Sequence, residues 1–197
     1  MHDKAVNNHT DNHKAIIETT QRWVEKLVVG LNLCPFAKRE LIKDRVRFVL
    51  SQATTEEQLL NDLHQELVWL EQHDAIETTL LIHPWVLSDF SDYNQFLDTA
   101  DDLLEQFDFT GVYQIASFHP HYQFDGTQPT DVENYTNKSP YPILHILREA
   151  TLEQRIADYP DSDDIPANNI ALLEQLGEDK VRALLISCFS PAQSQPE

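Results

Sequence analysis

The chain has 197 residues, of which 41% are hydrophobic and 24% charged, so its length and composition suit one globular domain with a sizeable core. Its 33 acidic residues outnumber 14 Lys and Arg, a formal net charge of −19, and residues 48–137 contain no Lys or Arg at all. This balance argues against a general nucleic-acid binder and against adhesion to anionic membranes, because both need a basic surface.

The two ends of the chain differ from its middle. Residues 1–12 and 189–197 are polar and lack periodicity, which predicts disordered tails around a single α/β domain at 13–188. The N-terminal segment has no apolar run typical of a signal peptide or a membrane span, so we expect a cytoplasmic protein. Cys34 and Cys188 make no disulfide framework, and we expect both to be reduced.

Hydrophobic periodicity predicts the elements in chain order. A helix is expected over residues 14–29, ended by Gly30 and Asn32. Strands and helices then alternate, with strands expected at 45–52, 77–83 and 111–118 and helices at 57–72 and 88–107. This order predicts an α/β fold with a small, mainly parallel sheet of three to four strands, joined by crossover helices.

The periodicity stops after residue 118 and returns near residue 140. A segment of more than 20 residues rich in Pro, Asn, Thr and aromatic residues lies between, and such long loops are usually functional or disordered. Two further helices are expected at 140–157 and 168–187, so additional helices flank the sheet at both ends of the chain.

The first candidate segment is NLCPFAKREL. Pro35 is typical of the first turn of a helix, which makes Cys34 its cap and places Lys38 and Arg39 on the helix. A cysteine at a helix N-terminus beside cations should have a pKa below its usual value, as a reactive thiolate requires. The structural alternative is a small, buried and inert cysteine at the junction of two helices.

The second candidate segment is SFHPHY. His119 follows the third strand, where an imidazole at the carboxyl end of a parallel sheet suits a general base. His119 and His121 could also share a strand face and chelate a metal, although Pro120 interrupts regular pairing. A hydrogen-bonded loop histidine is the structural alternative.

The third candidate segment is NYTNKSPYPILHILRE. Ser139 before Pro140 predicts another helix N-terminus, where free amides favour an anion, with Asn134, Asn137 and Lys138 approaching from the loop. On a helix, His145, Arg148 and Glu149 would face one way. The alternatives are a metal site using His145 and Glu149, or an intrahelical ion pair beside an apolar face.

Together the three segments hold much of the cationic content of an acidic protein. They therefore predict a local electropositive pocket for a small molecule that carries a carboxylate or phosphate. No GxGxxG, GxxxxGK[ST], GxSxG or HExxH motif occurs, so no nucleotide fingerprint supports a particular cofactor, which stays unknown.

The same segments resemble a known family. GLNLCPFA, FHPHYQF and NYTNKSPYPILHILRE are similar to the signatures of an uncharacterised bacterial family, domain of unknown function 1415, over about residues 23–155. The resemblance implies a small cytoplasmic α/β protein of unestablished activity, and it favours Cys34, His119 and the segment from Pro140 over a two-histidine metal site.

Three functional hypotheses follow. The first is a cysteine-dependent hydrolase, transferase or redox enzyme with catalytic Cys34, His119 and His145, in which the remaining candidates bind an anionic substrate: Lys38, Arg39, Asn134, Asn137, Lys138, Ser139, Arg148 and Glu149. The second is a transition-metal protein with ligands among His119, His121, His145 and Glu149. The third is a non-catalytic adaptor whose acidic helices meet a basic partner protein.

Overall fold

The computed structural model describes residues 3–190, with side chains from residue 11 onward. Its elements are α1 (Asp3–Trp23), a π-helix (Val24–Val29), α2 (Ala37–Ile42), β1 (Val46–Leu50), α3 (Glu56–Glu71), β2 (Thr78–Ile82), α4 (Phe90–Gln106), β3 (Tyr113–Phe118), a 3₁₀ helix (Val132–Thr136), β4 (Ile143–Arg148), α5 (Glu149–Ala157), a second 3₁₀ helix (Ser162–Asp164), α6 (Ile165–Leu176) and α7 (Glu178–Ser187). Residues 3–12, expected in the N-terminal tail, continue α1, whereas 1–2 and 191–197 lie outside the described residues.

The α/β class is confirmed, but the expectation of a mainly parallel sheet is wrong. The four strands lie in the order β1-β2-β4-β3. β1 and β2 are parallel, whereas β4 is antiparallel to both β2 and β3. The crossover through α4 therefore leaves a gap of one strand between β2 and β3, and the last strand in sequence fills it from the opposite direction.

The predicted helix at 140–157 is also wrong in its first half. Residues Ile143–Arg148 form β4, and only Glu149–Ala157 is helical. β4 pairs with a strand on each side, which supplies both sets of backbone hydrogen bonds that a central strand needs. Ser139 therefore leads into a strand, and no helix N-terminus forms there.

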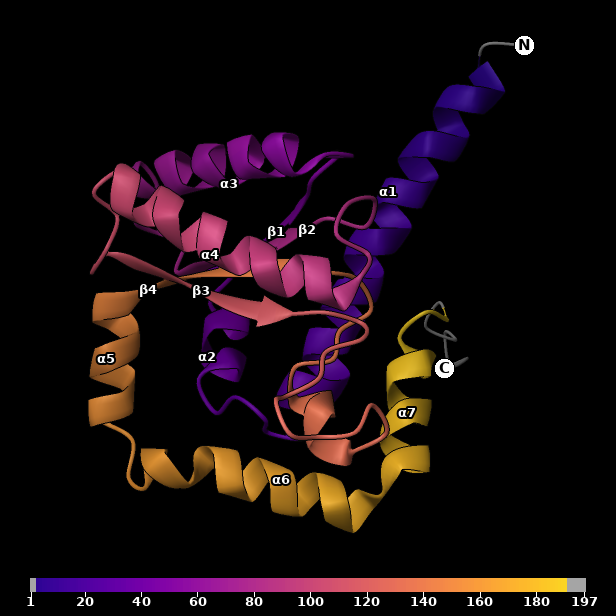
Figure 1. The fold of residues 1–197 in the computed structure, drawn as a ribbon, viewed down its shortest axis with the longest axis vertical. Coiled ribbons are helices and arrows are strands. Elements are labelled where there is room, and N and C mark those ends of the chain that lie inside the picture. The colour runs from indigo at the N-terminus through magenta and orange to yellow at the C-terminus, as the bar shows by residue number, and fades with distance from the viewer. Residues whose placement is uncertain (1–2, 191–197) are drawn as a thin grey trace.

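The sheet separates two hydrophobic layers. One face is covered by α3 and α4, whose leucines and aromatic residues pack against Leu81, Leu144 and Ile146. The other face packs against α1 and the π-helix through Trp23, Leu27, Leu80, Ile82 and Ile143. In Figure 1, α3 and α4 lie above the strands, whereas α2, α5 and α6 lie below them.

The C-terminal helices brace the long loop. The predicted helix at 168–187 is two helices, because Gly177 adopts a positive φ of 79° between α6 and α7. Leu173 and Val181 from these helices form a third cluster with Leu33 and Tyr135. The segment after β3 is thus an ordered part of the domain.

Candidate functional site

A cavity of about 250 Å³ lies between the sheet and the helices of the α1 face. Side chains of all four strands form its floor, among them Val46, Leu80, Ala116, Phe118 and Leu147. Its walls come from the end of α1, the π-helix, α2 and α5, and the lining is almost wholly apolar. A partly open, apolar pocket beside a few polar groups is the usual form of a small-molecule site.

The cavity does not lie where the sequence predicted. Val46 and Thr78 are the first residues of β1 and β2, so the cavity lies toward the amino ends of these strands. Ligands of doubly wound parallel sheets bind at the carboxyl ends. Here β4 runs between the parallel-oriented strands, and the usual rule does not apply.

A π-helix places Cys34 in the cavity wall. Its wide turn is closed by a hydrogen bond of 2.9 Å from the Gly30 amide to the Glu25 carbonyl, five residues back. The chain then turns so that the amides of Leu33 and Cys34 donate to the Val28 carbonyl at 2.8 Å and 3.4 Å. Val28 and Cys34 both line the cavity as a result.

The predicted low pKa of Cys34 is wrong. Burial raises the pKa of this thiol, and the backbone amides of Phe36 and Ala37, which lower it, do not outweigh that effect. α2 begins only at Ala37, with Phe36 as its cap, and it has six residues. Cys34 therefore lies in the cavity as a neutral thiol near pH 7.

His145 projects from β4 into the same cavity. Its Nε2 lies 2.7 Å from Thr78 Oγ1, and the Thr78 hydroxyl itself donates to the Ile146 carbonyl at 2.6 Å. Since the hydroxyl has one hydrogen, Nε2 must carry the ring proton and donate to Oγ1. Burial lowers the pKa of His145 to about 4, so the ring is neutral and the Nδ1 lone pair is unprotonated at pH 7.

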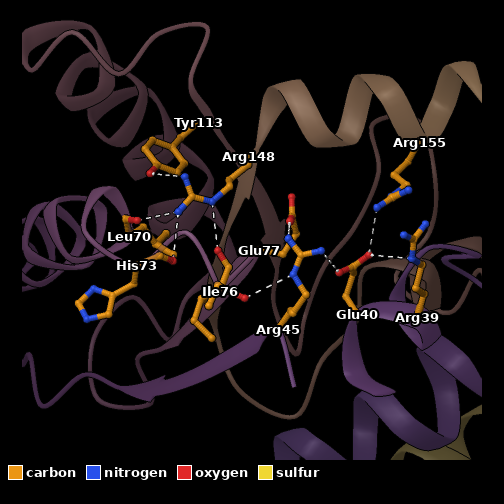
Figure 2. Close-up of polar contacts among 11 residues, drawn as sticks. Arg39, Glu40, Arg45, Leu70, His73, Ile76, Glu77, Tyr113, Arg148 and Arg155 are labelled. Carbon is orange, nitrogen blue, oxygen red and sulfur yellow. Dashed lines mark hydrogen bonds and ion pairs between the residues drawn. The ribbon is translucent and has the colours of Figure 1, made fainter. Parts of the chain in front are cut away.

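A cluster of ion pairs closes one end of the cavity. Arg45 contacts two buried carboxylates, Glu40 at 3.1 Å and Glu77 through its other terminal nitrogen, while Arg39 and Arg155 lie 3.8 Å from Glu40 (Figure 2). Glu40 Oε2, Glu77 Oε1 and Arg155 Nε are fully buried, and none of the three has a hydrogen-bond partner among the described residues. The cluster thus ties α2 and α5 to the sheet, with three guanidinium groups around two carboxylates.

Arg148 does not reach into the cavity with its charge. On a strand, His145 and Arg148 point to opposite faces, so the prediction that they share one helix face is wrong. The guanidinium donates to the Leu70 carbonyl at 2.6 Å, the Ile76 carbonyl at 3.1 Å and the Tyr113 hydroxyl at 3.0 Å (Figure 2). These bonds take up the Arg148 guanidinium, which was expected from the sequence to bind an anionic substrate.

His119 lies on the other face of the sheet. It is fully buried against Phe90 and Tyr93, its Nδ1 accepts from the His121 amide at 3.0 Å, and its Nε2 donates to the Leu87 carbonyl at 3.1 Å. Burial lowers its pKa. Both ring nitrogens are therefore occupied, and the position is that of the hydrogen-bonded loop histidine that we weighed as the alternative.

The loop candidates brace the segment after β3. Asn134 is fully buried and bonds Phe124, Thr127 and Gln128, while Asn137 donates to the Ser117 carbonyl at 3.0 Å. Lys138 donates to the Pro129 carbonyl at 2.7 Å, and burial lowers its pKa. The Ser139 hydroxyl donates to the Tyr141 carbonyl at 2.6 Å. Each of these four side chains is therefore hydrogen-bonded within the chain.

The remaining candidates are scattered. Lys38 and Arg39 are exposed on α2, and Glu149 lines an open acidic groove with Asp101 and Glu105. Among the described residues, no three metal-ligating side chains come together. Of the sequence-predicted residues, Cys34, His145 and the stem of Arg148 line the cavity.

Sequence reasoning missed three residues at this site, Glu40, Thr78 and Arg155. Thr78 begins a strand that continues with Thr79 and three apolar residues, and a threonine there is ordinary for a sheet. Glu40 is one of many acidic residues, and only its burial distinguishes it. A signal for Glu40 did exist, because five bases gather in residues 38–47 around it.

The fold and the cavity define a small α/β protein with a ligand-sized apolar cavity under one face of a mixed sheet. No helix among the described residues has the length and apolar character of a membrane span. The chain belongs to the family described as "Protein of unknown function (DUF1415)", whose model matches residues 15–183. No curated protein and no solved structure matches the chain.

Proposed function

We propose that the protein binds a small, mainly apolar molecule in the cavity between the sheet and the π-helix. The observation that carries this proposal is the apolar cavity itself, whose lining includes Cys34 and His145 from the family-like segments. π-Helical turns are rare and are frequent at functional sites, and here one forms the wall beside Cys34.

The cavity size limits the ligand. An engineered cavity of about 150 Å³ lined by apolar side chains binds benzene, so about 250 Å³ suits a molecule somewhat larger than benzene. An apolar lining favours such a molecule by removing its surface from water.

The cavity argues against the anionic substrate that the sequence suggested. The charges of Arg45 and Arg148 are taken up by carboxylates, carbonyls and a phenol, and Lys138 lies in the loop. An anion transferred into this space would lose its water, and the two lining cations, Arg148 and Arg155, already face carbonyls and Glu40. A neutral ligand is the better match.

Any chemistry on the ligand would use Cys34. It is the strongest nucleophile among the lining residues, and the enzyme hypothesis survives in this narrower form. Its neutral thiol must lose a proton before it attacks, which makes the reaction slower than that of an activated thiolate. Binding is therefore the function that the geometry supports best.

The test is binding of p-xylene by calorimetry and by ligand-observed NMR. We expect p-xylene to bind the native chain with a Kd of about 1 mM or below. It should not bind Ala116→Leu, because the larger leucine side chain fills the part of the cavity that lies against β3. Ala183→Leu, on the exposed face of α7, is the matched control and should bind like the native chain. Absence of native binding, or equal binding by a folded Ala116→Leu variant, would overturn the proposal.

A further inference from the structure

The orientation of His145 is fixed from one side only. Thr78 holds Nε2, and the Thr78 hydroxyl is held in turn by the Ile146 carbonyl. Nδ1 has no hydrogen-bond partner among the described residues, and it retains accessible surface. Because the ring is enclosed by the sheet and the cavity walls, this surface belongs to the cavity.

An unpaired lone pair in an apolar space is costly. A buried acceptor that lacks a donor loses the hydrogen bond that it would make to water. Among the other polar groups at the cavity, Arg45 pairs with Glu40 and Glu77, Arg148 donates to carbonyls, and the atoms without a hydrogen bond, Glu40 Oε2, Glu77 Oε1 and Arg155 Nε, are buried out of reach of a ligand. Nδ1 is thus a polar atom that a ligand can satisfy.

We propose that the ligand is a neutral molecule with an apolar body and one hydroxyl group, which donates its hydrogen to Nδ1 of His145. This inference rests on the proposed function and names its ligand class. Thr78 is then a positioning residue, since it keeps the ring proton on Nε2 and the lone pair on Nδ1.

Charged alternatives fit less well. A carboxylate has no hydrogen to donate and would face the Nδ1 lone pair, so an anion is disfavoured. An ammonium group would lose its hydration in an apolar space and would lie near the Arg45 and Arg155 guanidinium groups. A hydroxyl meets the single acceptor at the lowest cost of desolvation.

The experiment compares three probes on the native chain: p-cresol, p-xylene and benzoate. p-Cresol and p-xylene have nearly the same shape and differ in one hydroxyl. We expect p-cresol to bind about tenfold more tightly than p-xylene, as one hydrogen bond to a buried acceptor allows. Benzoate should not bind.

Two variants test whether His145 causes the preference for p-cresol over p-xylene. His145→Phe keeps an aromatic ring but removes the Nδ1 acceptor. The affinity for p-cresol should therefore fall to that for p-xylene, while p-xylene still binds. Thr78→Val removes the hydroxyl that orients the ring, and it should reduce the preference for p-cresol without abolishing p-xylene binding. A preference for p-cresol that persists in His145→Phe overturns the inference.

A second measurement does not depend on the variants folding. In native protein with ¹⁵N-labelled histidine, p-cresol should shift the Nδ1 resonance of His145, whereas p-xylene should leave it almost unchanged. If p-xylene binds but p-cresol binds no better and leaves Nδ1 unmoved, this inference fails and the proposed function stands. If neither probe binds, both fail.

Discussion

Replacement of Arg148 by methionine tests whether this residue is structural. Its guanidinium joins three parts of the chain, because it donates to Leu70 in the last turn of α3, to Ile76 before β2 and to the Tyr113 hydroxyl on β3 (Figure 2). The carbonyls at the end of a helix carry partial negative charge, which a nearby cation stabilises. Methionine keeps most of the stem and removes every donor.

The expected loss follows from these contacts. A hydrogen bond to a charged group contributes about 1.5–3 kcal/mol, and the lower figure applies to a partly solvated side chain. Counting only the two short carbonyl bonds, to Leu70 at 2.6 Å and Ile76 at 3.1 Å, gives a loss of about 3 kcal/mol in the free energy of unfolding. For a domain of this size, that lowers Tm by roughly 6–12 °C.

Urea unfolding followed by circular dichroism measures this change. Arg39→Met is the control, since Arg39 is half-exposed with a long ion pair of 3.8 Å, and it should change stability by less than about 0.5 kcal/mol. Arg148→Lys should recover less than half of the loss, because an ammonium cannot span the three acceptors. A loss below about 1 kcal/mol in Arg148→Met would refute the structural role.

Three further predictions concern the cavity wall and the buried histidines. Gly30→Ala should destabilise the chain by more than about 1 kcal/mol in urea unfolding, because a Cβ there lies 2.2 Å from the Lys26 carbonyl oxygen; an unchanged midpoint would contradict this close approach. Iodoacetamide should alkylate Cys34 of the folded chain more slowly than free cysteine at pH 7, because burial raises the pKa of the Cys34 thiol. In denaturant, Cys34 should react as fast as free cysteine. Alkylation of the folded chain faster than that of free cysteine would contradict the burial argument. Burial lowers the pKa of His83 and His145 to about 4 and also lowers the pKa of His119, so between pH 6.5 and 4 the unfolded chain binds more protons than the folded chain. His83 and His145 should each lower the free energy of unfolding by about 3 kcal/mol over this range. In His145→Phe the fall should be smaller by about 3 kcal/mol, and a flat profile in the native chain would exclude neutral buried rings.

Elements with their own amphipathic pattern were predictable from sequence. β1, α3, β2, α4 and β3 lie within a few residues of the predicted ranges, because each presents one apolar face with the period of its own structure. β4 lacks such a pattern. Residues 143–148 are apolar at four of six positions on both faces, as a central strand requires, and a short apolar run after Ser-Pro is equally typical of a helix start.

The candidate site was less predictable because its contacts cross the sheet. Thr78 orients His145 although 67 residues separate them, and this pairing depends on β4 entering the sheet beside β2. Because β4 was predicted as a helix, His145 was wrongly expected to share a face with Arg148 and Glu149. Cys34 could be located as a candidate, but its pKa depends on burial by α2 and the π-helix, which local sequence does not reveal.

The charge pattern acquires a physical meaning once the sheet is known. Residues 48–137, which hold 17 acidic residues without a Lys or Arg, include the two helices that cover one face, α3 and α4. The cavity lies under the opposite face, where α2 and α5 supply Arg39 and Arg155 to the cluster around Glu40. Arg148 and Arg155 thus line the cavity and Arg45 lies beside it, whereas Lys38 and Lys138, which the sequence assigned to the same electropositive pocket, do not line it. Two buried carboxylates, Glu40 and Glu77, pair with the cluster arginines there, so the ion pairs hold the cavity walls together.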